Sequence, residues 1–221
     1  MATPAHPATQ PRHHVDPADA RHQGVRIWRW GAAALALMCL LCLGTQPGVE
    51  GVRQVIRATA RTSLLFFLLA YTAQAVSLTW PGARSAWLRR HRRQWGWLLA
   101  TSHGFHATGI VALAWMAPAL FEQLSPIGQR IGPSVAYVVL AAMVATSFDR
   151  SAAWLGPRWW ARLHTWGSHY LCLSFLVANG KRVAQQPVYA LPVLLLILAV
   201  LWRLWAARQR RTPGVSASAQ G

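Results

Sequence analysis

The sequence predicts an all-α integral membrane protein, a bundle of six transmembrane helices with both termini in the cytoplasm. Two observations support this fold class. Hydrophobic residues make up 54% of the 221-residue chain and charged residues only 12%, about half the charged share of soluble domains. The apolar residues also lie in long runs, each long enough to cross a hydrocarbon core of about 30 Å.

Six such runs follow one another along the chain. Residues 1–26 come before the first run; they are rich in Pro, Ala and His and predict a disordered cytoplasmic tail without the apolar core of a signal peptide. Residues 207–221 predict a second disordered tail, so one membrane domain covers residues 27–206. The predicted spans are residues 27–46, 62–80, 95–117, 132–148, 159–178 and 186–205, of which the fourth is the shortest.

The distribution of basic residues orients the predicted bundle. The chain has 22 Lys and Arg residues against 5 acidic residues, a formal net charge of +17. With the N-terminus inside, sixteen of the basic residues fall in cytoplasmic segments, and this bias follows the positive-inside rule. The charge therefore needs no nucleic acid as a partner. The basic residues on the opposite side are Arg53, Arg57, Arg61, Arg130, Lys181 and Arg182.

Four histidines lie inside predicted spans: His103 and His106 on the third, His164 and His169 on the fifth. Ionisable groups in a membrane are costly unless they are paired or liganded, so these four are candidates for function. No Asp or Glu lies inside any predicted span, which argues against a proton relay or a cation transporter. Neutral imidazoles from two helices can instead ligate a haem iron between them.

The choice of pair stays open on spacing alone. His103 and His106 are about 300° apart around their helix and share a broad face, whereas His164 and His169 are about 140° apart. His106 lies about 16 Å from the start of its span, a depth that His169 matches better than His164. Small residues that would leave room for a macrocycle lie nearby: Gly104, Ala107, Gly109, Gly167 and Ser168.

Two segments, WLRRHRRQWGWLLATSHGFH (87–106) and LGPRWWARLHTWGSHY (155–170), resemble the ferric reductase-like transmembrane domain family. They are most similar to the haem-binding membrane subunits of bacterial periplasmic methionine sulfoxide reductase systems. The first is similar to an Arg-Arg-x-Leu-Gly-Leu run that ends in a haem histidine ten residues after the glycine. The second is similar to a Leu-Gly-x-x-Trp-x-x-Leu-His segment. The resemblance runs from about Val49 to the end of the sixth span.

The resemblance implies a multi-pass protein of the bacterial inner membrane, in contact with lipid, in which His106 and His164 ligate the iron of a haem b. It implies an electron-transfer subunit of an oxidoreductase system. The electron donor would be quinol or a separate flavin reductase on the cytoplasmic side, and the acceptor would be periplasmic. A separate redox partner protein is expected, and FMN is a second candidate cofactor. Arg93 and Arg158 can meet haem propionates or a flavin phosphate at the membrane surface.

The sequence departs from the family at Val177, where the family usually has a further histidine. One haem is therefore expected, with His169 or His103 as an alternative ligand. The departure also motivates a different hypothesis, a haem-free membrane partner or assembly subunit with the same fold. A small-molecule or metal-ion transporter with histidines along its path is a third hypothesis.

Overall fold

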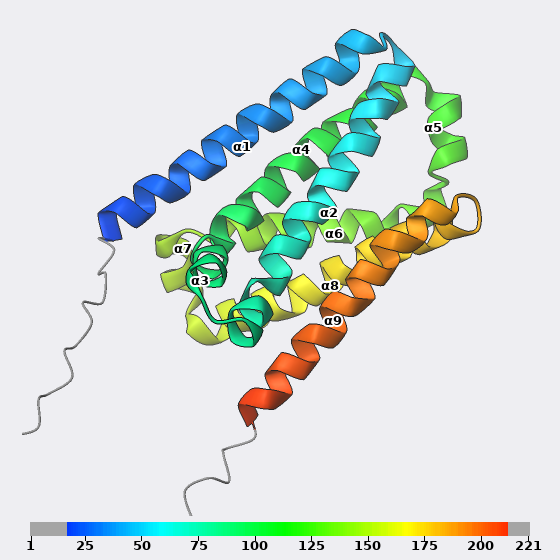
Figure 1. Ribbon diagram of the computed structural model, residues 1–221. Coiled ribbons are helices and arrows are strands. Elements are labelled where there is room, and N and C mark those ends of the chain that lie inside the picture. Colours follow the sequence, from blue (N-terminus) through cyan, green and yellow to red (C-terminus); the bar gives the residue numbers. More distant parts are fainter. Residues whose placement is uncertain (1–16, 212–221) are drawn as a thin grey trace, which may run out of the picture.

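The long apolar runs of the sequence form the six longest helices of the part of the chain that the structure describes (Figure 1). The structure, a computed structural model, describes residues 17–211, and within that range every regular element is helical. The long helices are α1 (Pro17–Thr45), α2 (Val49–Thr79), α4 (Arg92–Met116), α6 (Ile131–Ala145), α8 (Pro157–Val183) and α9 (Ala190–Arg211).

The long helices alternate in direction, and short elements join them at the two ends of the bundle (Figure 1). The short helices α3 (Ala83–Arg90) and α7 (Asp149–Leu155) lie at the same end as both ends of the described chain. The helix α5 (Pro118–Leu124) and the turn between α8 and α9 lie at the opposite end. The remaining elements are the 3-10 helices η1 (Ile127–Gln129) and η2 (Pro187–Tyr189).

Three segments of the described chain are long and apolar enough to cross a membrane: His22–Thr45, Val49–Thr79 and Pro187–Arg210. The pair α6 and α7, bent by 105°, would be a fourth crossing if the two helices count as one broken span. The same test of length and composition does not include α4 and α8, the helices that carry the four candidate histidines. The structure thus shows three or four candidate crossings where the sequence predicts six.

Two helices begin well before the predicted spans. Helix α1 begins at Pro17, inside the predicted tail, and α2 begins at Val49, although its span was predicted from residue 62. In the first turns of α2, Glu50 forms ion pairs with Arg53 and Arg57 at 2.8 and 2.9 Å. Such pairs support a helix that hydropathy does not detect. Helix α9 extends to Arg211, into the second predicted tail, while residues 1–16 and 212–221 lie outside the described range.

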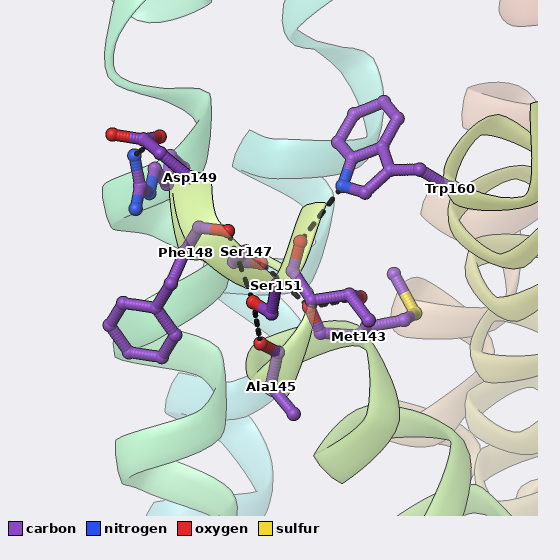
Figure 2. A network of polar contacts seen from close by, with 9 residues as sticks. Met143, Ala145, Ser147, Phe148, Asp149, Ser151 and Trp160 are labelled. Carbon is purple, nitrogen blue, oxygen red and sulfur yellow. Dashed lines mark hydrogen bonds and ion pairs between the residues drawn. The ribbon is translucent and has the colours of Figure 1, made fainter. Parts of the chain in front are cut away.

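Among the six predicted spans, the fourth, residues 132–148, differs most from the structure. Helix α6 has 15 residues and ends at Ala145, so it is about 22 Å long. The chain then bends into α7, and two serines satisfy carbonyls that the bend leaves unpaired: Ser147 donates to Met143 and Ser151 donates to Ala145 (Figure 2). The predicted span therefore runs three residues past the end of α6: Thr146, Ser147 and Phe148 lie in the bend before α7.

The interior core is shared by all the long helices except α1, which packs against α2 and α4 from outside (Figure 1). Large apolar side chains also cover the outer faces of α1 and α9; they include Leu37, Leu40, Leu41, Leu191, Leu194, Leu198 and Leu201, all exposed. Soluble proteins rarely expose apolar faces of this extent. The buried core residues are Phe67, Tyr71, Leu99, Ala136, Leu140, Leu171, Cys172, Leu196 and Ala199.

Candidate functional site

His106 lies on α4 and directs its Nδ1 atom at α2. This atom is 3.0 Å from the carbonyl oxygen of Ile56 and 3.1 Å from Oγ1 of Thr59. Because a carbonyl oxygen can only accept hydrogen bonds, the imidazole proton lies on Nδ1. The Nε2 atom therefore keeps its lone pair, and a second nitrogen fixed by a backbone carbonyl is the usual state of a metal-ligating histidine.

A buried hydroxyl network joins α2 and α4 beside His106. Ser102, one turn before His106, accepts a hydrogen bond from Ser63 at 2.9 Å and donates to the carbonyl oxygen of Thr59 at 3.0 Å. The hydroxyl of Thr62 lies 2.8 Å from the same Ser102 oxygen. Thr59, Ser63 and Ser102 are completely buried. The network holds α2 and α4 in one register and so positions His106.

His103 lies three residues before His106 on α4 and contacts α6 and α8. Its ring centroid is 5.7 Å from that of His106, 5.3 Å from that of Tyr137 and 5.6 Å from that of Phe175. The Nδ1 atom of His103 and the hydroxyl of Tyr137 are buried without a hydrogen-bond partner in the described part of the chain. Buried polar groups are nearly always paired, so two unpaired groups side by side mark a candidate binding site. His103, His106 and Tyr137 are called the α4 histidine cluster below.

His164 lies in the first half of α8 and contacts the bend between α6 and α7. Its Nε2 atom is 3.1 Å from Oγ1 of Thr146, and its ring stacks on Trp160 at a centroid distance of 4.3 Å. The Thr146 hydroxyl donates to the carbonyl oxygen of Ala142 at 2.8 Å, so it accepts from Nε2 of His164. Trp160 donates to the carbonyl oxygen of Thr146, as Figure 2 shows. In this conformation Nε2 of His164 is occupied.

His169 belongs to a third location, between α2, α8 and α9. Its side chain is exposed, and its Nδ1 atom lies 3.1 Å from the hydroxyl of Tyr71 on α2. The guanidinium of Arg203 on α9 lies over the Tyr71 ring, 3.9 Å from its centroid. The phenol of Tyr71 thus has His169 at its hydroxyl and a cation at its face.

The α4 histidine cluster and His164 lie at different places along the helices that they share. On α6, Tyr137 contacts His103 and Thr146 contacts His164, and about 14 Å of helix separates these two positions. On α8, Phe175 contacts His103, and His164 lies about 16 Å nearer the start of that helix. The structure therefore does not bring His106 and His164 together.

His169 is also separated from the cluster. It lies about 9 Å along α8 from Phe175, the α8 residue that contacts His103. Of the four histidines predicted from the sequence, only His103 and His106 contact each other in the structure. Within residues 22–210, no three His, Cys, Asp or Glu side chains converge as ligands of one metal ion.

The two arginines predicted to bind a cofactor lie at the end of the bundle that contains α3 and α7. Arg93 forms an ion pair with Asp149 at 3.1 Å, and its guanidinium lies over the Trp97 ring, 4.8 Å from the centroid. Arg93 thus joins α4 to α7. Arg158 is exposed in the first turn of α8.

The small residues near the histidines have different roles. A Cβ atom on Gly109 would lie 2.9 Å from Ile56, and one on Gly167 would lie 2.6 Å from the sulfur of Met143. These two glycines allow the close approach of α4 to α2 and of α8 to α6, so they serve helix packing. A Cβ atom on Gly104 would meet nothing within 4 Å.

Several residues of the site were not predicted from the sequence. Tyr137 is the one phenol in the otherwise apolar run of the fourth span, and this contrast was the available signal. Thr59 lies before the predicted start of the second span, so it was not considered as intramembrane. The carbonyl of Ile56 has no sequence signal, because its role depends on which side chain of α4 lies opposite.

No protein-family model matches the chain, and no curated protein or solved structure matches it significantly. The ferric reductase-like resemblance therefore rests on the two segments 87–106 and 155–170. What the chain does is argued below from the geometry of its own residues.

Proposed function

We propose that this chain is a b-type haem protein of the bacterial inner membrane, an electron-transfer subunit of an oxidoreductase system. In this proposal six helices cross the membrane and both termini are cytoplasmic. The end of the bundle that contains α3, α7 and both described chain ends also carries most of the basic residues (Figure 1). This charge distribution supports the cytoplasmic assignment of that end.

The observation that carries the haem proposal is the state of His106. The carbonyl oxygen of Ile56 lies 3.0 Å from Nδ1 of His106 and accepts the proton that this nitrogen carries. The Nε2 atom of His106 is therefore left with a free lone pair in an apolar helix bundle. His103 and Tyr137 beside it present buried polar atoms without partners among the described residues. These features fit a haem held from the α4 side, with His106 as ligand and His103 as the alternative nearest to it.

One-electron transfer would be supplied by the haem iron when the haem is bound. The chain's own residues do three things in this proposal. Ile56 and Thr59 orient the His106 ring, the apolar side chains around the cluster exclude water, and Tyr137 offers a hydroxyl as a hydrogen-bond donor. Together they would set the donor strength of His106 and the polarity of the site, which influence the potential of a bound haem.

The cytoplasmic side is the proposed entry point for electrons, from quinol or from a separate flavin reductase, with FMN as a second candidate cofactor. Arg93 and Arg158 lie at that end of the bundle and supply positive charge for a propionate or a phosphate. The acceptor would be a separate periplasmic partner. His164, the second ligand implied by the family resemblance, would have to release Thr146 before its Nε2 atom could bind iron.

A second candidate function, a haem-free partner or assembly subunit, is favoured by one specific observation. The histidines of α8 lie about 9 and about 16 Å along that helix from Phe175, which contacts His103. No imidazole of α8 therefore lies opposite the α4 histidine cluster. The two candidate functions differ in whether the purified protein contains haem.

Electron transfer across the bilayer tests the first proposal. The haem-loaded protein is reconstituted into liposomes that contain ferricyanide, which does not cross lipid, and a quinol analogue or a flavin reductase with its nicotinamide donor is added outside. We expect ferricyanide to be bleached by the wild type and by His22→Ala, whose histidine is exposed on α1. We expect His106→Ala to reduce the rate to that of liposomes without protein. Equal rates for the His106→Ala variant and the wild type would refute the role of His106.

A further inference from the structure

The α4 histidine cluster lies nearer to the end of the bundle that contains α5 than to the end that contains α3 and α7. The carbonyl of Ile56, which holds His106, lies about 10 Å from the start of α2. His106 lies about 15 Å from the end of α4, and Phe175, which contacts His103, lies about 12 Å from the end of α8. All three of these helix ends lie at the end of the bundle with α5 and the turn between α8 and α9 (Figure 1).

The two arginines expected to bind a haem propionate lie at the other end of the bundle. Arg93 precedes His106 by about 20 Å along α4, and Arg158 precedes Phe175 by about 26 Å along α8. A propionate is a short side chain of the macrocycle, so it does not span either distance from an iron bound to His106. The propionates of a haem in the α4 histidine cluster would therefore bind elsewhere.

Arg182 is the cation that α8 places on the side of the cluster. It follows Phe175 by seven residues, so the two side chains lie on one face of α8, about 10 Å apart along the helix. The ring of Phe175 contacts that of His103 at a centroid distance of 5.6 Å, so this face of α8 is turned to α4. The positive charge of Arg182 also acts on the imidazole of His106 through space.

Arg182 has no carboxylate as a partner in the described part of the chain. Its Nη1 atom lies 3.5 Å from the hydroxyl of Tyr189, and its guanidinium lies 5.5 Å from the centroid of the Tyr189 ring. Both contacts are with a neutral group, and the ion pairs within residues 22–210 use other arginines. The side chain of Arg182 is exposed. It can therefore turn to a carboxylate without breaking an ion pair.

We infer that Arg182 binds a propionate carboxylate of the haem that His106 ligates. A guanidinium group can form two parallel hydrogen bonds with a carboxylate, which adds orientation as well as affinity. The inference rests on the proposed function, because it requires a haem on His106. It assigns the propionate to the opposite end of the bundle from Arg93 and Arg158.

The test compares two haems in titrations of the purified full chain without haem: haem b, and its dimethyl ester, whose esterified propionates carry no charge. Arg182→Gln should bind haem b about fivefold more weakly than the wild type, the upper range for an exposed ion pair. The same variant should bind the dimethyl ester as the wild type does, which also shows that its site is folded.

The matched control is Lys181→Gln, an equal change of charge one residue away. The Nζ atom of Lys181 donates to the side-chain oxygen of Gln129 in η1 at 3.2 Å, away from the face of α8 that carries Phe175. Lys181→Gln should therefore bind both haems as the wild type does.

The other outcomes separate the alternatives. Equal affinities of Arg182→Gln and Lys181→Gln for haem b would overturn the inference and leave the role of His106 in place. An equal loss of both haems in Arg182→Gln would also overturn it, because Arg182 would then support the fold and not a propionate. So would weaker binding of haem b in Arg93→Gln but not in Arg182→Gln. A wild type that binds neither haem would overturn the proposed function, and this inference with it.

Discussion

The carbonyl oxygen of Ile56 decides the chemistry of His106, because it is an acceptor that cannot become a donor. The imidazole must therefore carry its proton on Nδ1. Thr59 reinforces this state: its hydroxyl donates to the carbonyl oxygen of Val55 at 2.6 Å and is left to accept from His106. The free lone pair on Nε2 of His106 therefore depends on residues of α2 as well as on α4, which carries the histidine.

Replacement of Thr59 by Val, a side chain of similar volume, tests whether the Thr59 hydroxyl helps to orient His106. Thr59→Val removes one of the two acceptors at Nδ1 of His106 and leaves the Ile56 carbonyl in place. We expect the haem to be held about tenfold more weakly, as for other residues that orient a metal ligand. Haem titration of the purified apoprotein measures this. Thr108→Val is the control, because the exposed Thr108 hydroxyl bonds only within α4. Equal haem affinities of the Thr59→Val and Thr108→Val variants would contradict a role of Thr59 in orienting His106.

Tyr137 leads to a prediction about the haem-free protein. Its hydroxyl is buried and unpaired in the described chain, and such a group destabilises a fold by about 1 to 3 kcal/mol. Tyr137→Phe should therefore raise the unfolding temperature of haem-depleted protein. In haem-loaded protein the same change should shift the midpoint potential, since the hydroxyl would lie beside the haem. A lower unfolding temperature without haem would show that Tyr137 already has a partner.

Each helix pair that positions the site is held by a close approach at a glycine. Gly109 brings α4 against Ile56 on α2, the residue whose carbonyl holds His106. Gly167 does the same for α8 against Met143 on α6. The register of α4 on α2 is therefore fixed by steric fit next to the hydrogen bonds that depend on it.

Gly109→Val should force α4 away from α2, because its Cβ atom alone would lie 2.9 Å from Ile56. We expect destabilisation by about 1 to 3 kcal/mol, typical of overpacking, together with weaker haem binding. Thermal unfolding in detergent measures the first effect and the haem spectrum the second. Gly104→Ala is the matched control, since a Cβ atom there meets nothing within 4 Å and alanine favours the helix. Similar unfolding temperatures for the two variants would argue against the close approach.

The positions of the long helices could be predicted from the sequence, because apolar runs have to fold as helices in lipid. Their ends were less predictable: α2 begins at Val49 through ion pairs of Glu50, and α6 ends at Ala145 where serine side chains take over the carbonyls. The four histidines were found because imidazole is rare in apolar runs. The partners of His106 could not be found, because they depend on the register between α2 and α4.

At the scale of the whole molecule, the six long helices of the described chain bring both of its ends to the same end of the bundle (Figure 1). Most basic residues of the sequence belong to segments at that end. The proposed site lies where α2, α4, α6 and α8 meet.

The proposed orientation, with both termini in the cytoplasm, predicts which ends of the bundle can be labelled from outside an intact cell. In a chain with its native cysteines replaced, Gln123→Cys on α5 should react with a membrane-impermeant maleimide in intact cells, once the outer membrane is opened. Ala83→Cys on α3 should react only after the inner membrane is lysed. Both positions are exposed, so access and not burial decides the result. Labelling of both sites in intact cells, or the reverse pattern, would contradict cytoplasmic termini.

The central claim is that His106 ligates a haem, and the reduced-minus-oxidised absorption spectrum of the purified protein tests it most directly. We predict b-type Soret and α bands in the wild type and in His22→Ala, and loss of most of both bands in His106→Ala at an unchanged elution volume in gel filtration. A wild type that stays without haem after expression with added haem, or a His106→Ala variant with the full spectrum, would contradict the claim.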